Sequence, residues 1–258
     1  MAPLSDTLEP SRFMIDSAQD GPTNMAVDEA ILTAVGRGEV PPSLRFYRWS
    51  EPTISLGHFQ KYAEQAHLAE SFKSLPVVRR ITGGGAILHD AELTYSLILP
   101  GHHQLGTDKP PAVLYTAVHQ ALVDLLDSLG LRAELRGGPR SANQQRGPFF
   151  CFQRVNSSDV MIDGSKIAGS AQRRTLNALL QHGSLMLDNP LNQPGLATLA
   201  DYNLNPPPEA EGLAQAWAKR LAETLDLEFC NSDLTQQEKS LVQNLRSKYA
   251  SDEWTRRR

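Results

Sequence analysis

Hydrophobic residues recur at helical spacing in several stretches of the chain. One apolar stripe follows Pro110-Pro111, where a missing backbone N–H costs little at a helix start, and Gly130 lies just beyond its end. Thr235 and Glu238 are spaced as a capping box at the start of the last such stretch. The pattern predicts helices at residues 23–34, 110–126, 210–225 and 235–249.

Shorter apolar runs lie between these helices and read as strands. Residues 159–162 and 165–168 flank Asp163-Gly164, a dipeptide typical of a two-residue hairpin turn. Residues 178–187 read as another strand pair or as one long strand, and residues 149–152 form a short apolar run. Further strands are predicted at residues 44–49, 53–56, 77–80, 86–88, 93–99 and 131–135. Because the strands cluster instead of alternating strictly with helices, the pattern favours an α+β domain whose mixed, largely antiparallel sheet is flanked by helices.

The composition is that of one globular domain. The chain has 258 residues, of which 40% are hydrophobic and 21% charged, so it can bury a core and is not disordered as a whole. Residues 1–12 are polar and predicted to be a loose N-terminus, and residues 210–258 are expected to add helices to the same domain. The formal net charge of -4 argues against a general nucleic-acid-binding protein.

Cysteine content and apolar run length narrow the class of protein further. With 2 cysteines the chain is neither a disulfide scaffold nor a cysteine-rich zinc protein, and no His, Cys and Asp spacing reads as a metal site. No run approaches the roughly 18 apolar residues that span a bilayer. Residues 1–6 lack the basic and apolar regions of a secretory signal. We therefore expect a soluble, cytoplasmic protein with no membrane partner.

The first candidate site is a glycine-rich segment at residues 79–90. Arg79 and Arg80 precede Thr82 and the run Gly83-Gly84-Gly85. Glycines let a backbone pass close to a ligand and aim N–H groups at an anion, and arginines can add charge-assisted hydrogen bonds. The segment is neither a P-loop nor a dinucleotide-binding fingerprint. A glycine-rich turn between strands is the competing structural interpretation.

The second candidate is Lys166, which lies just past the predicted hairpin turn among small residues that include Gly169 and Ser170. Small neighbours leave room for a bound group, and a lysine there could polarise a carbonyl. An exposed lysine on a strand is the alternative reading.

The third candidate is Cys151, which lies 166 − 151 = 15 residues before Lys166. A free thiol is only about 3% thiolate at pH 7, whereas a neighbouring cation that lowers its pKa to about 7 makes it about half thiolate. Lys166 or Arg80 could be that cation. A buried structural cysteine is the alternative, and Cys230 is interpreted in that way, as ordinary core.

The remaining polar candidates favour structural roles. His89 and Asp90 could form an acid/base pair, but adjacent strand residues point to opposite faces. His182 lies within an apolar strand, and residues 256–258, which are all arginine, read as a solvated tail.

Taken together, these segments resemble the lipoate–protein ligase and octanoyltransferase family, which is related to the biotin protein ligase catalytic domain. The similarity extends from about Phe13 to Trp254. Residues 79–90 are similar to the family's Arg-Arg-x-x-Gly-Gly-Gly loop with its trailing His-Asp, and residues 166–172 to the segment that carries the family's lysine. Segments similar to the family's first helix and to its strands lie at residues 24–30, 44–49, 53–60 and 181–185.

The resemblance implies a catalytic domain of the biotin/lipoate protein ligase type at residues 13–258, with a tunnel for an eight-carbon acyl chain or a lipoyl group. By resemblance, Lys166 is catalytic and the ligand is bound by residues of the glycine-rich loop and the lysine segment: Arg79, Arg80, Thr82, Gly83, Gly84, Gly85, His89, Gly169 and Ser170.

Cys151-Phe152 stands where one transferase branch of this family has its catalytic Cys-Phe. The resemblance therefore implies a cysteine-dependent acyltransferase that takes octanoyl from acyl carrier protein, forms a thioester on Cys151 and passes the acyl group to a lysine of a lipoyl-domain protein, such as the glycine-cleavage carrier. Such a transferase requires neither ATP nor a metal.

Other activities remain open at this point. An ATP-dependent lipoate–protein ligase would form lipoyl-AMP with ATP and Mg²⁺, hold the phosphate with Arg79 and Arg80, and not use Cys151. An amidotransferase would move octanoyl between two lipoyl-domain proteins by the same cysteine chemistry. A rival of another class is a catalytically silent module that binds lipoyl domains.

Overall fold

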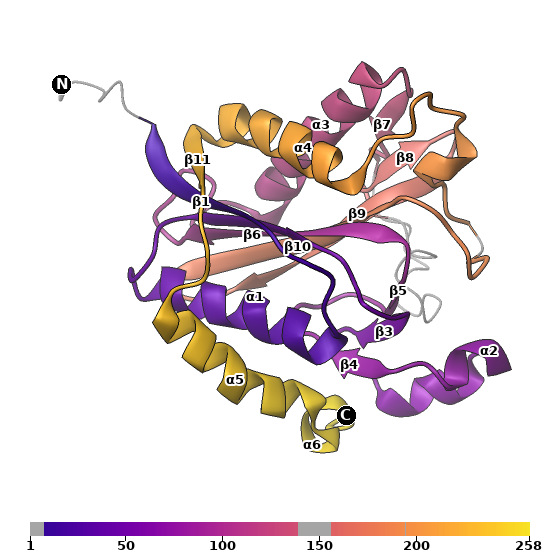
Figure 1. Ribbon diagram of the computed structural model, residues 1–258, viewed down its shortest axis with the longest axis horizontal. Coiled ribbons are helices and arrows are strands. Elements are labelled where there is room, and N and C mark those ends of the chain that lie inside the picture. The colour runs from indigo at the N-terminus through magenta and orange to yellow at the C-terminus, as the bar shows by residue number, and fades with distance from the viewer. Residues whose placement is uncertain (1–7, 139–155, 194) are drawn as a thin grey trace.

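The computed structural model describes residues 8–138, 156–193 and 195–258 of the chain. Within these residues an eight-stranded mixed sheet runs through the middle of the molecule in the order β11-β1-β2-β6-β10-β9-β8-β7 (Figure 1). Its strands are β1 (Glu9–Ile15), β2 (Ser43–Tyr47), β6 (Glu92–Pro100), β7 (Ala133–Leu135), β8 (Val160–Ile162), β9 (Ser165–Arg174), β10 (Ala178–Met186) and β11 (Leu227–Asn231).

Most neighbouring strands of this sheet run antiparallel. The exceptions are at one edge, where β1 lies parallel to both β2 and β11. The predicted α+β class with a mixed, largely antiparallel sheet is therefore confirmed. Residues 178–187, for which two readings were open, form the single long strand β10.

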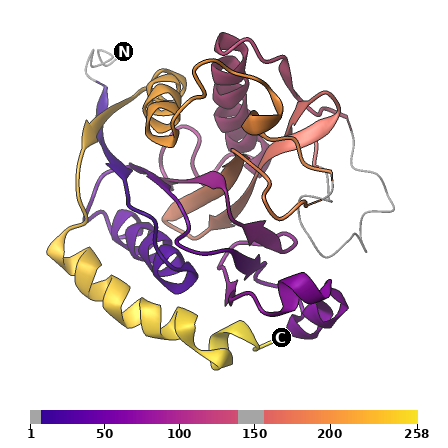
Figure 2. The same cartoon turned by 45° about the vertical axis from the view of Figure 1, so that its right-hand side comes forward.

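Helices cover both faces of the sheet (Figures 1 and 2). Helices α3 and α4 lie on one face and α1 on the other, while α5 packs against the outer side of α1 and leads into α6 at the C-terminal end. The helices are α1 (Gly21–Gly36), α2 (Glu70–Lys73), α3 (Pro111–Ser128), α4 (Ala210–Leu225), α5 (Gln236–Ala250) and α6 (Asp252–Thr255). The helices predicted from hydrophobic spacing are confirmed, and Thr235 caps α5 through the predicted capping box with Glu238.

The two faces of the sheet differ in chemistry. The face under α3 and α4 is an apolar core in which Leu97, Leu179 and Trp217 are completely buried. The opposite face, under α1, carries two rows of small or polar residues, because residues paired directly across strands share a face. One row is Arg45, Ser96, His182 and Ala171, and the next is Tyr47, Thr94, Ser184 and Gly169.

A second sheet of three strands lies beside this polar face. Its order is β4-β3-β5, with β3 at Thr53–Leu56, β4 at Val77–Arg79 and β5 at Ile87–His89. The chain between β4 and β5 contains the glycine-rich segment, so the fold brings that segment to the polar face of the large sheet.

Residues 9–12 belong to β1, not to a loose N-terminus as predicted. Their backbone pairs with β2 and β11, and the Arg12 guanidinium forms a buried ion pair with Glu238 of α5 at 2.7 Å. The polar character of the segment is explained by this ion pair, which a local reading of the sequence cannot detect.

Cys230 is exposed, so its interpretation as core is wrong. It lies on β11, the edge strand of the large sheet, where a side chain has a neighbouring strand on one side only. Edge position, not sequence hydrophobicity, decides its exposure.

The three C-terminal arginines are exposed to solvent, as predicted, but they are not a free tail. Arg257 lies over the Trp254 ring at 3.7 Å and donates to the His58 ring, while Arg258 lies over the Phe59 ring at 5.2 Å. The Tyr62 N–H donates to the carbonyl of Arg258 at 2.9 Å. The C-terminal segment is thus docked on the chain that follows β3.

No helix within residues 8–138, 156–193 and 195–258 is long and apolar enough to cross a bilayer.

Candidate functional site

Lys166 is buried at the start of β9 and forms an ion pair with Asp159. The Nζ–Oδ2 distance is 2.8 Å, and the side chains are 3% and 2% exposed. A β-carbon at Gly169 would lie only 2.5 Å from Lys166 Cε. Glycine at this position therefore makes the space through which the lysine side chain passes, and the alternative of an exposed strand lysine is excluded.

The local sequence explains how Lys166 reaches this place. Asp163 and Gly164 both have positive φ, at 49° and 77°, as a tight hairpin turn between β8 and β9 requires. A shift of register between Val160 and Met161 then interrupts the pairing of β8 with β9. Such a bulge re-aims side chains, which places Lys166 on the same face of the sheet as Gly169.

The glycine-rich loop lies against this same face and is built around Arg80. The Arg80 Nη2 donates to the carbonyls of Gly83 and Gly85 at 2.8 and 2.7 Å, and the side chain is 1% exposed. Gly84 has φ of +95°, which only glycine adopts at low cost. The loop is a fixed turn folded over a buried cation.

Gly57 gives the loop room on its other side. A β-carbon at Gly57 would lie 2.0 Å from the carbonyl oxygen of Gly84, so the two backbones are in direct contact. This glycine precedes the predicted loop by more than twenty residues and was not identified as part of the site.

Thr82 connects the loop to the large sheet and to α1. Its Oγ1 lies 2.7 Å from His182 Nε2, and His182 Nδ1 lies 3.0 Å from Asp28 Oδ2. Burial alone would raise the pKa of Asp28, but the hydrogen bond from His182 and the charge of Arg45 lower it below its usual value.

His89 forms a second connection of the same type. Its Nε2 lies 2.7 Å from Ser55 Oγ and its Nδ1 lies 2.6 Å from Glu92 Oε1, while its ring stacks on Trp49 at 3.8 Å. Burial lowers the pKa of His89, and Glu92 only partly offsets this effect, so the ring is neutral at pH 7. Asp90, its sequence neighbour, is not part of this arrangement.

Arg79 has a different environment from Arg80. Its guanidinium donates to the carbonyls of Gly57 and Gln60 and, through Nε and Nη2, to the carbonyl of Thr255. The side chain is completely buried. Arg79 therefore fastens the chain after β3 to the C-terminal end of α6, and its assignment to a ligand stays a prediction.

Ser170 lies on the opposite face of β9 from Gly169, as strand alternation requires. Its Oγ lies 2.7 Å from Tyr95 Oη and 2.6 Å from His119 Nε2 on α3. The structure thus separates Ser170 from the glycine loop, whereas it brings Lys166, Gly169 and Thr82 to one face.

Cys151 lies outside the described residues. The description resumes at Asn156, 156 − 151 = 5 residues later, and the N–H of Asn156 donates to the Asp159 carboxylate at 2.7 Å. On the other side of the interval, Gly137 N–H donates to the carbonyl of Ser157 at 2.9 Å. Both flanking ends therefore lie together next to the Lys166–Asp159 pair, and the role of Cys151 stays a prediction.

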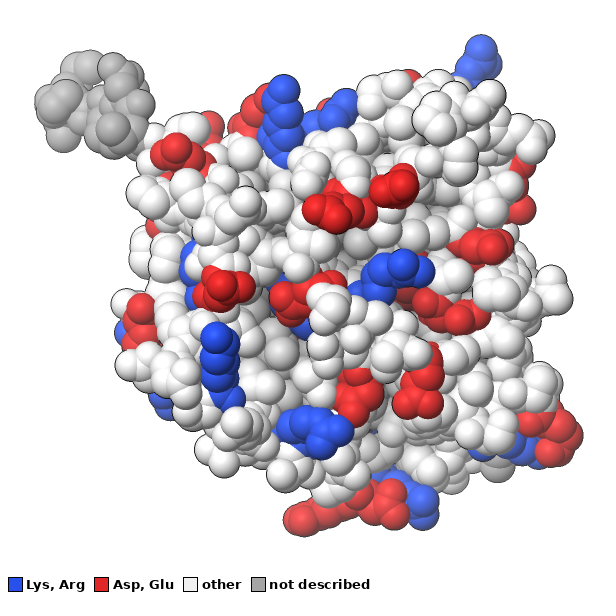
Figure 3. All heavy atoms as spheres, viewed as in Figure 1, with Lys and Arg blue, Asp and Glu red and all other residues white. Residues whose placement is uncertain are grey.

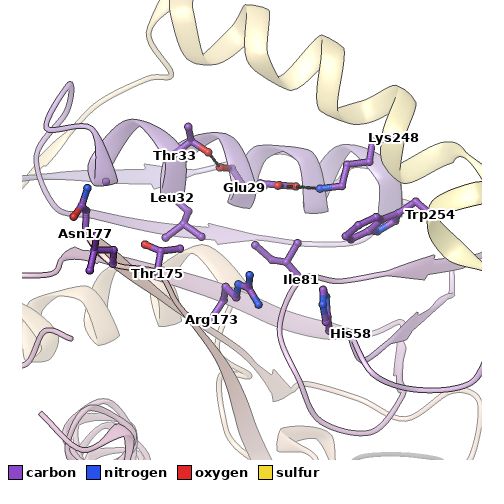
Figure 4. A pocket seen from close by; sticks show the side chains of 12 residues that line it. Glu29, Leu32, Thr33, His58, Ile81, Arg173, Thr175, Asn177, Lys248 and Trp254 are labelled. Carbon is purple, nitrogen blue, oxygen red and sulfur yellow. Dashed lines mark hydrogen bonds and ion pairs between the residues drawn. The ribbon is translucent and has the colours of Figure 1, made fainter. Parts of the chain in front are cut away.

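A pocket of about 350 Å³ opens between α1 and the end of β9 (Figure 4). Glu29, Leu32 and Thr33 project into it from α1, and Arg173 and His58 lie on the other side. Its volume is at the small end of the range for ligand pockets. None of the predicted site residues in the described part of the chain lines it, although its lining residue Ile81 directly precedes Thr82.

Cations dominate the electrostatics around this pocket. Partial burial together with the charges of Arg257 and Arg173 lowers the pKa of His58 to about 4, so His58 is neutral at pH 7. Elsewhere charges are mixed: on the face shown in Figure 3, acidic and basic side chains are interspersed. That face therefore lacks the continuous basic patch by which nucleic-acid-binding proteins hold their ligand.

Several buried polar residues of the site were not found by sequence reasoning. Asp159, Asp28, Glu92 and Ser55 each lie within or beside an apolar run. A carboxylate or hydroxyl that is buried with such a run needs a polar partner. No cluster of His, Cys, Asp and Glu suited to a metal ion occurs in the part of the chain that the structure describes.

Comparison with known proteins gives consistent matches. Residues 20–239 match the family described as the lipoyl protein ligase A/B catalytic domain. The chain is 34% identical to the octanoyltransferase LipM of Brevibacillus brevis, over 97% of this chain and 100% of that protein. It is 30% identical to the octanoyltransferase LipM of Staphylococcus aureus, over 94% of this chain and 96% of that protein.

Solved structures show the same fold. Protein Ta0514 of T. acidophilum, a candidate lipoate protein ligase, superimposes with a TM-score of 0.78 at 26% identity, over 96% of this chain and 99% of that chain. A lipoate-protein ligase A bound with ATP superimposes with a TM-score of 0.76 at 24% identity, over 97% of this chain and 99% of that chain.

Proposed function

The chain belongs to the lipoyl protein ligase A/B catalytic domain family, and on that premise we propose that it is an octanoyltransferase of protein lipoylation. The observation that carries the proposal is similarity at 30 to 34% identity, over nearly the full length of both partners, to proteins named octanoyltransferase. The acceptor is a lysine of a lipoyl-domain protein, and the enzyme works in the cytoplasm.

The proposed reaction proceeds in two steps. In the first step Cys151 gives up its proton and the thiolate attacks the octanoyl thioester of acyl carrier protein. A thioester forms on the enzyme, the carbon–sulfur bond to the carrier breaks, and the carrier leaves as a thiolate that takes up one proton. In the second step the amine of the acceptor lysine attacks this thioester. An amide forms, the amine loses a proton and the Cys151 thiol is restored.

Lys166 has the position that this chemistry needs. Both steps pass through a tetrahedral intermediate whose oxygen is negative, and a fixed cation stabilises that charge. The buried carboxylate of Asp159 holds the Lys166 ammonium at 2.8 Å, on the face of the sheet where the glycine loop also lies. Because Gly169 has no side chain, the Lys166 side chain can lie across this part of the sheet and reach Asp159.

The proposed step requires neither ATP nor a metal ion, since the donor is already a thioester and amide formation makes the second step favourable. The rival activity is ATP-dependent ligation of lipoate, in which Cys151 has no role. An octanoyl amidotransferase shares the cysteine chemistry but takes its donor from another lipoyl-domain protein.

Intact-protein mass spectrometry tests the proposal directly. Wild type, Cys151→Ala and the matched control Cys230→Ala are each mixed with octanoyl acyl carrier protein in the absence of ATP. We expect one octanoyl adduct, labile to hydroxylamine, on wild type and Cys230→Ala and none on Cys151→Ala. The control shows whether the adduct depends on Cys151 in particular, because Cys230 is the other cysteine of the chain and is exposed on an edge strand.

Three other results would each decide for a rival. Modification of a lipoyl domain only when lipoate and ATP are supplied, equally in wild type and Cys151→Ala, would make the protein a ligase. An adduct formed only from an octanoylated lipoyl domain would make it an amidotransferase. Binding without turnover under all three conditions would leave the silent binding module.

A further inference from the structure

Two buried carboxylates, Asp28 and Glu92, each begin a series of hydrogen bonds that ends at the glycine loop. We infer that both are positioning residues, which fix the loop through two carboxylate–histidine–hydroxyl relays that meet at Arg80. Neither carboxylate lines the pocket of Figure 4, and both are at most 1% exposed, so they act on the loop through their neighbours.

The first relay starts on α1. Asp28 Oδ2 accepts a hydrogen bond from His182 Nδ1 at 3.0 Å, and the histidine tautomer with its proton at Nδ1 has its acceptor at Nε2. Nε2 therefore accepts from the hydroxyl of Thr82 at 2.7 Å. The Thr82 oxygen in turn accepts from Arg80 Nε at 3.0 Å. His182 and Thr82 each donate one hydrogen bond and accept another, and every donation is directed toward Asp28.

The second relay repeats this order from β6. Glu92 Oε1 accepts from His89 Nδ1 at 2.6 Å, and His89 Nε2 accepts from the hydroxyl of Ser55 at 2.7 Å. The Ser55 oxygen accepts from Arg80 Nη1 at 3.1 Å. The relays approach Arg80 from different elements, one through α1 and β10 and the other through β6 and β5.

Arg80 links the two relays to the glycine loop, because its guanidinium contacts both hydroxyls and two loop carbonyls. With Nε and Nη1 occupied by the two hydroxyls, Nη2 holds the carbonyls of Gly83 and Gly85. In a trans peptide the carbonyl and the following N–H point in opposite directions. The N–H of Gly84 is therefore directed away from Arg80, as a donor to a developing oxyanion must be.

Each carboxylate determines which ring nitrogen of its histidine carries the proton, because it accepts a hydrogen bond from Nδ1. In Asp28→Asn the side-chain amide can donate to His182 Nδ1, which moves the ring proton to Nε2. Thr82 Oγ1 then faces two donors, Nε2–H and Arg80 Nε–H, and its own hydroxyl proton loses its acceptor. The hydrogen bond between His182 and Thr82 then runs in the opposite direction, and the loop is no longer held in its orientation. The substitution leaves the packing almost unchanged, because asparagine has nearly the volume of aspartate.

Steady-state kinetics of octanoyl transfer test this assignment, which rests on the proposed function. We expect Asp28→Asn to lower kcat by about 10- to 100-fold, the scale of a displacement of about 1 Å in a catalytic group, with KM little changed. Glu92→Gln should act in the same way. Thr82→Ser, which keeps the hydroxyl, should retain most of kcat, whereas Thr82→Val should lose as much as Asp28→Asn.

A double-mutant cycle separates positioning from general destabilisation. Asp28 and Thr82 do not touch, so purely structural effects on kcat would multiply. If Asp28 acts through His182 and Thr82, adding Asp28→Asn to Thr82→Val changes kcat by less than about 2-fold. Multiplicative losses would overturn the inference. Glu238→Gln, which breaks a buried ion pair outside the relays, is the control and should leave kcat unchanged.

Hydrogen exchange gives a readout that does not depend on the reaction. Amide protons of residues 83–86 should exchange faster in Asp28→Asn and in Glu92→Gln than in wild type, and at the wild-type rate in Glu238→Gln. Unchanged exchange in both relay variants would overturn the inference even if kcat falls. If wild type transfers no octanoyl at all, the proposed function fails, and the exchange experiment still decides whether the relays hold the loop.

Discussion

Gly169 lies beside the side chain of Lys166, and its replacement by alanine tests whether the exact place of that lysine matters. The new β-carbon would be 2.5 Å from Lys166 Cε, 2.7 Å from Nζ and 3.1 Å from Asp159 Oδ1. Ordinary van der Waals contact begins at 3.4 Å, so the lysine must move by about 3.4 − 2.5 = 0.9 Å. The backbone at Gly169 does not require glycine, since its φ is outside the left-handed region.

The size of the effect follows from this displacement. Misplacement of a catalytic group by about 1 Å can cost about 100-fold in rate, which corresponds to about 2.7 kcal/mol of transition-state stabilisation. Overpacking a well-filled site costs about 1–3 kcal/mol of stability. We therefore expect Gly169→Ala to fold, with a lowered melting temperature, and to transfer octanoyl about 100 times more slowly than wild type.

The assay is single-turnover octanoyl transfer to a lipoyl domain, measured beside thermal unfolding. Gly212→Ala is the matched control: Gly212 lies in α4, and a β-carbon there meets no atom within 4 Å. That variant should keep the wild-type rate and gain up to about 1 kcal/mol of stability from helix propensity. A wild-type rate in Gly169→Ala would refute the view that Asp159 and Gly169 position Lys166 for catalysis.

Three further substitutions probe stability. Lys166→Met should lower the free energy of unfolding by about 3–5 kcal/mol, because it leaves the buried Asp159 without its ion-pair partner. In urea denaturation the double variant Lys166→Met/Asp159→Leu should regain this stability, but it should not regain octanoyl transfer. Burial raises the pKa of Glu238, but hydrogen bonds from Arg12 and the Thr235 N–H lower it more, so this carboxylate stabilises the fold above about pH 4.3 and the contribution is lost as pH falls through its lowered pKa. Thermal melts from pH 3 to 7 should therefore show a shallower acid decline for Glu238→Gln than for wild type. Thr235→Ala should cost about 1 kcal/mol in urea denaturation, since it removes the cap of α5.

Periodicity predicted the long helices and the central strands because each of these elements buries its own apolar stripe or face. Strands β1 and β11, at one edge of the large sheet, escaped prediction. β1 contains Pro10 and Arg12, and its partner β11 is more than two hundred residues away, as the pairing of Glu9 with Leu227 shows. A strand stabilised mainly by a distant partner has a weak local signal.

The candidate site was predictable only in part, for a related reason. The family resemblance located the glycine loop and Lys166, but it could not show that Ser170 faces α3 while Gly169 faces α1. Asp28 illustrates the limit: its partner His182 is 154 residues away, so no spacing rule connects them. The geometry of buried polar pairs depends on the complete fold.

The hydrogen bonds between Arg79 and the segment at residues 254–255 determine when the glycine loop becomes anchored during synthesis. Its guanidinium holds the carbonyl of Thr255, 176 residues further along, and Trp254 donates back to the carbonyl of Arg79 at 2.8 Å. At about 5–20 residues per second a ribosome needs about 9–35 s to make the intervening chain. Throughout that interval the nascent chain has the whole glycine loop but not the segment that fastens its base, so the loop becomes anchored only after Thr255 has been made.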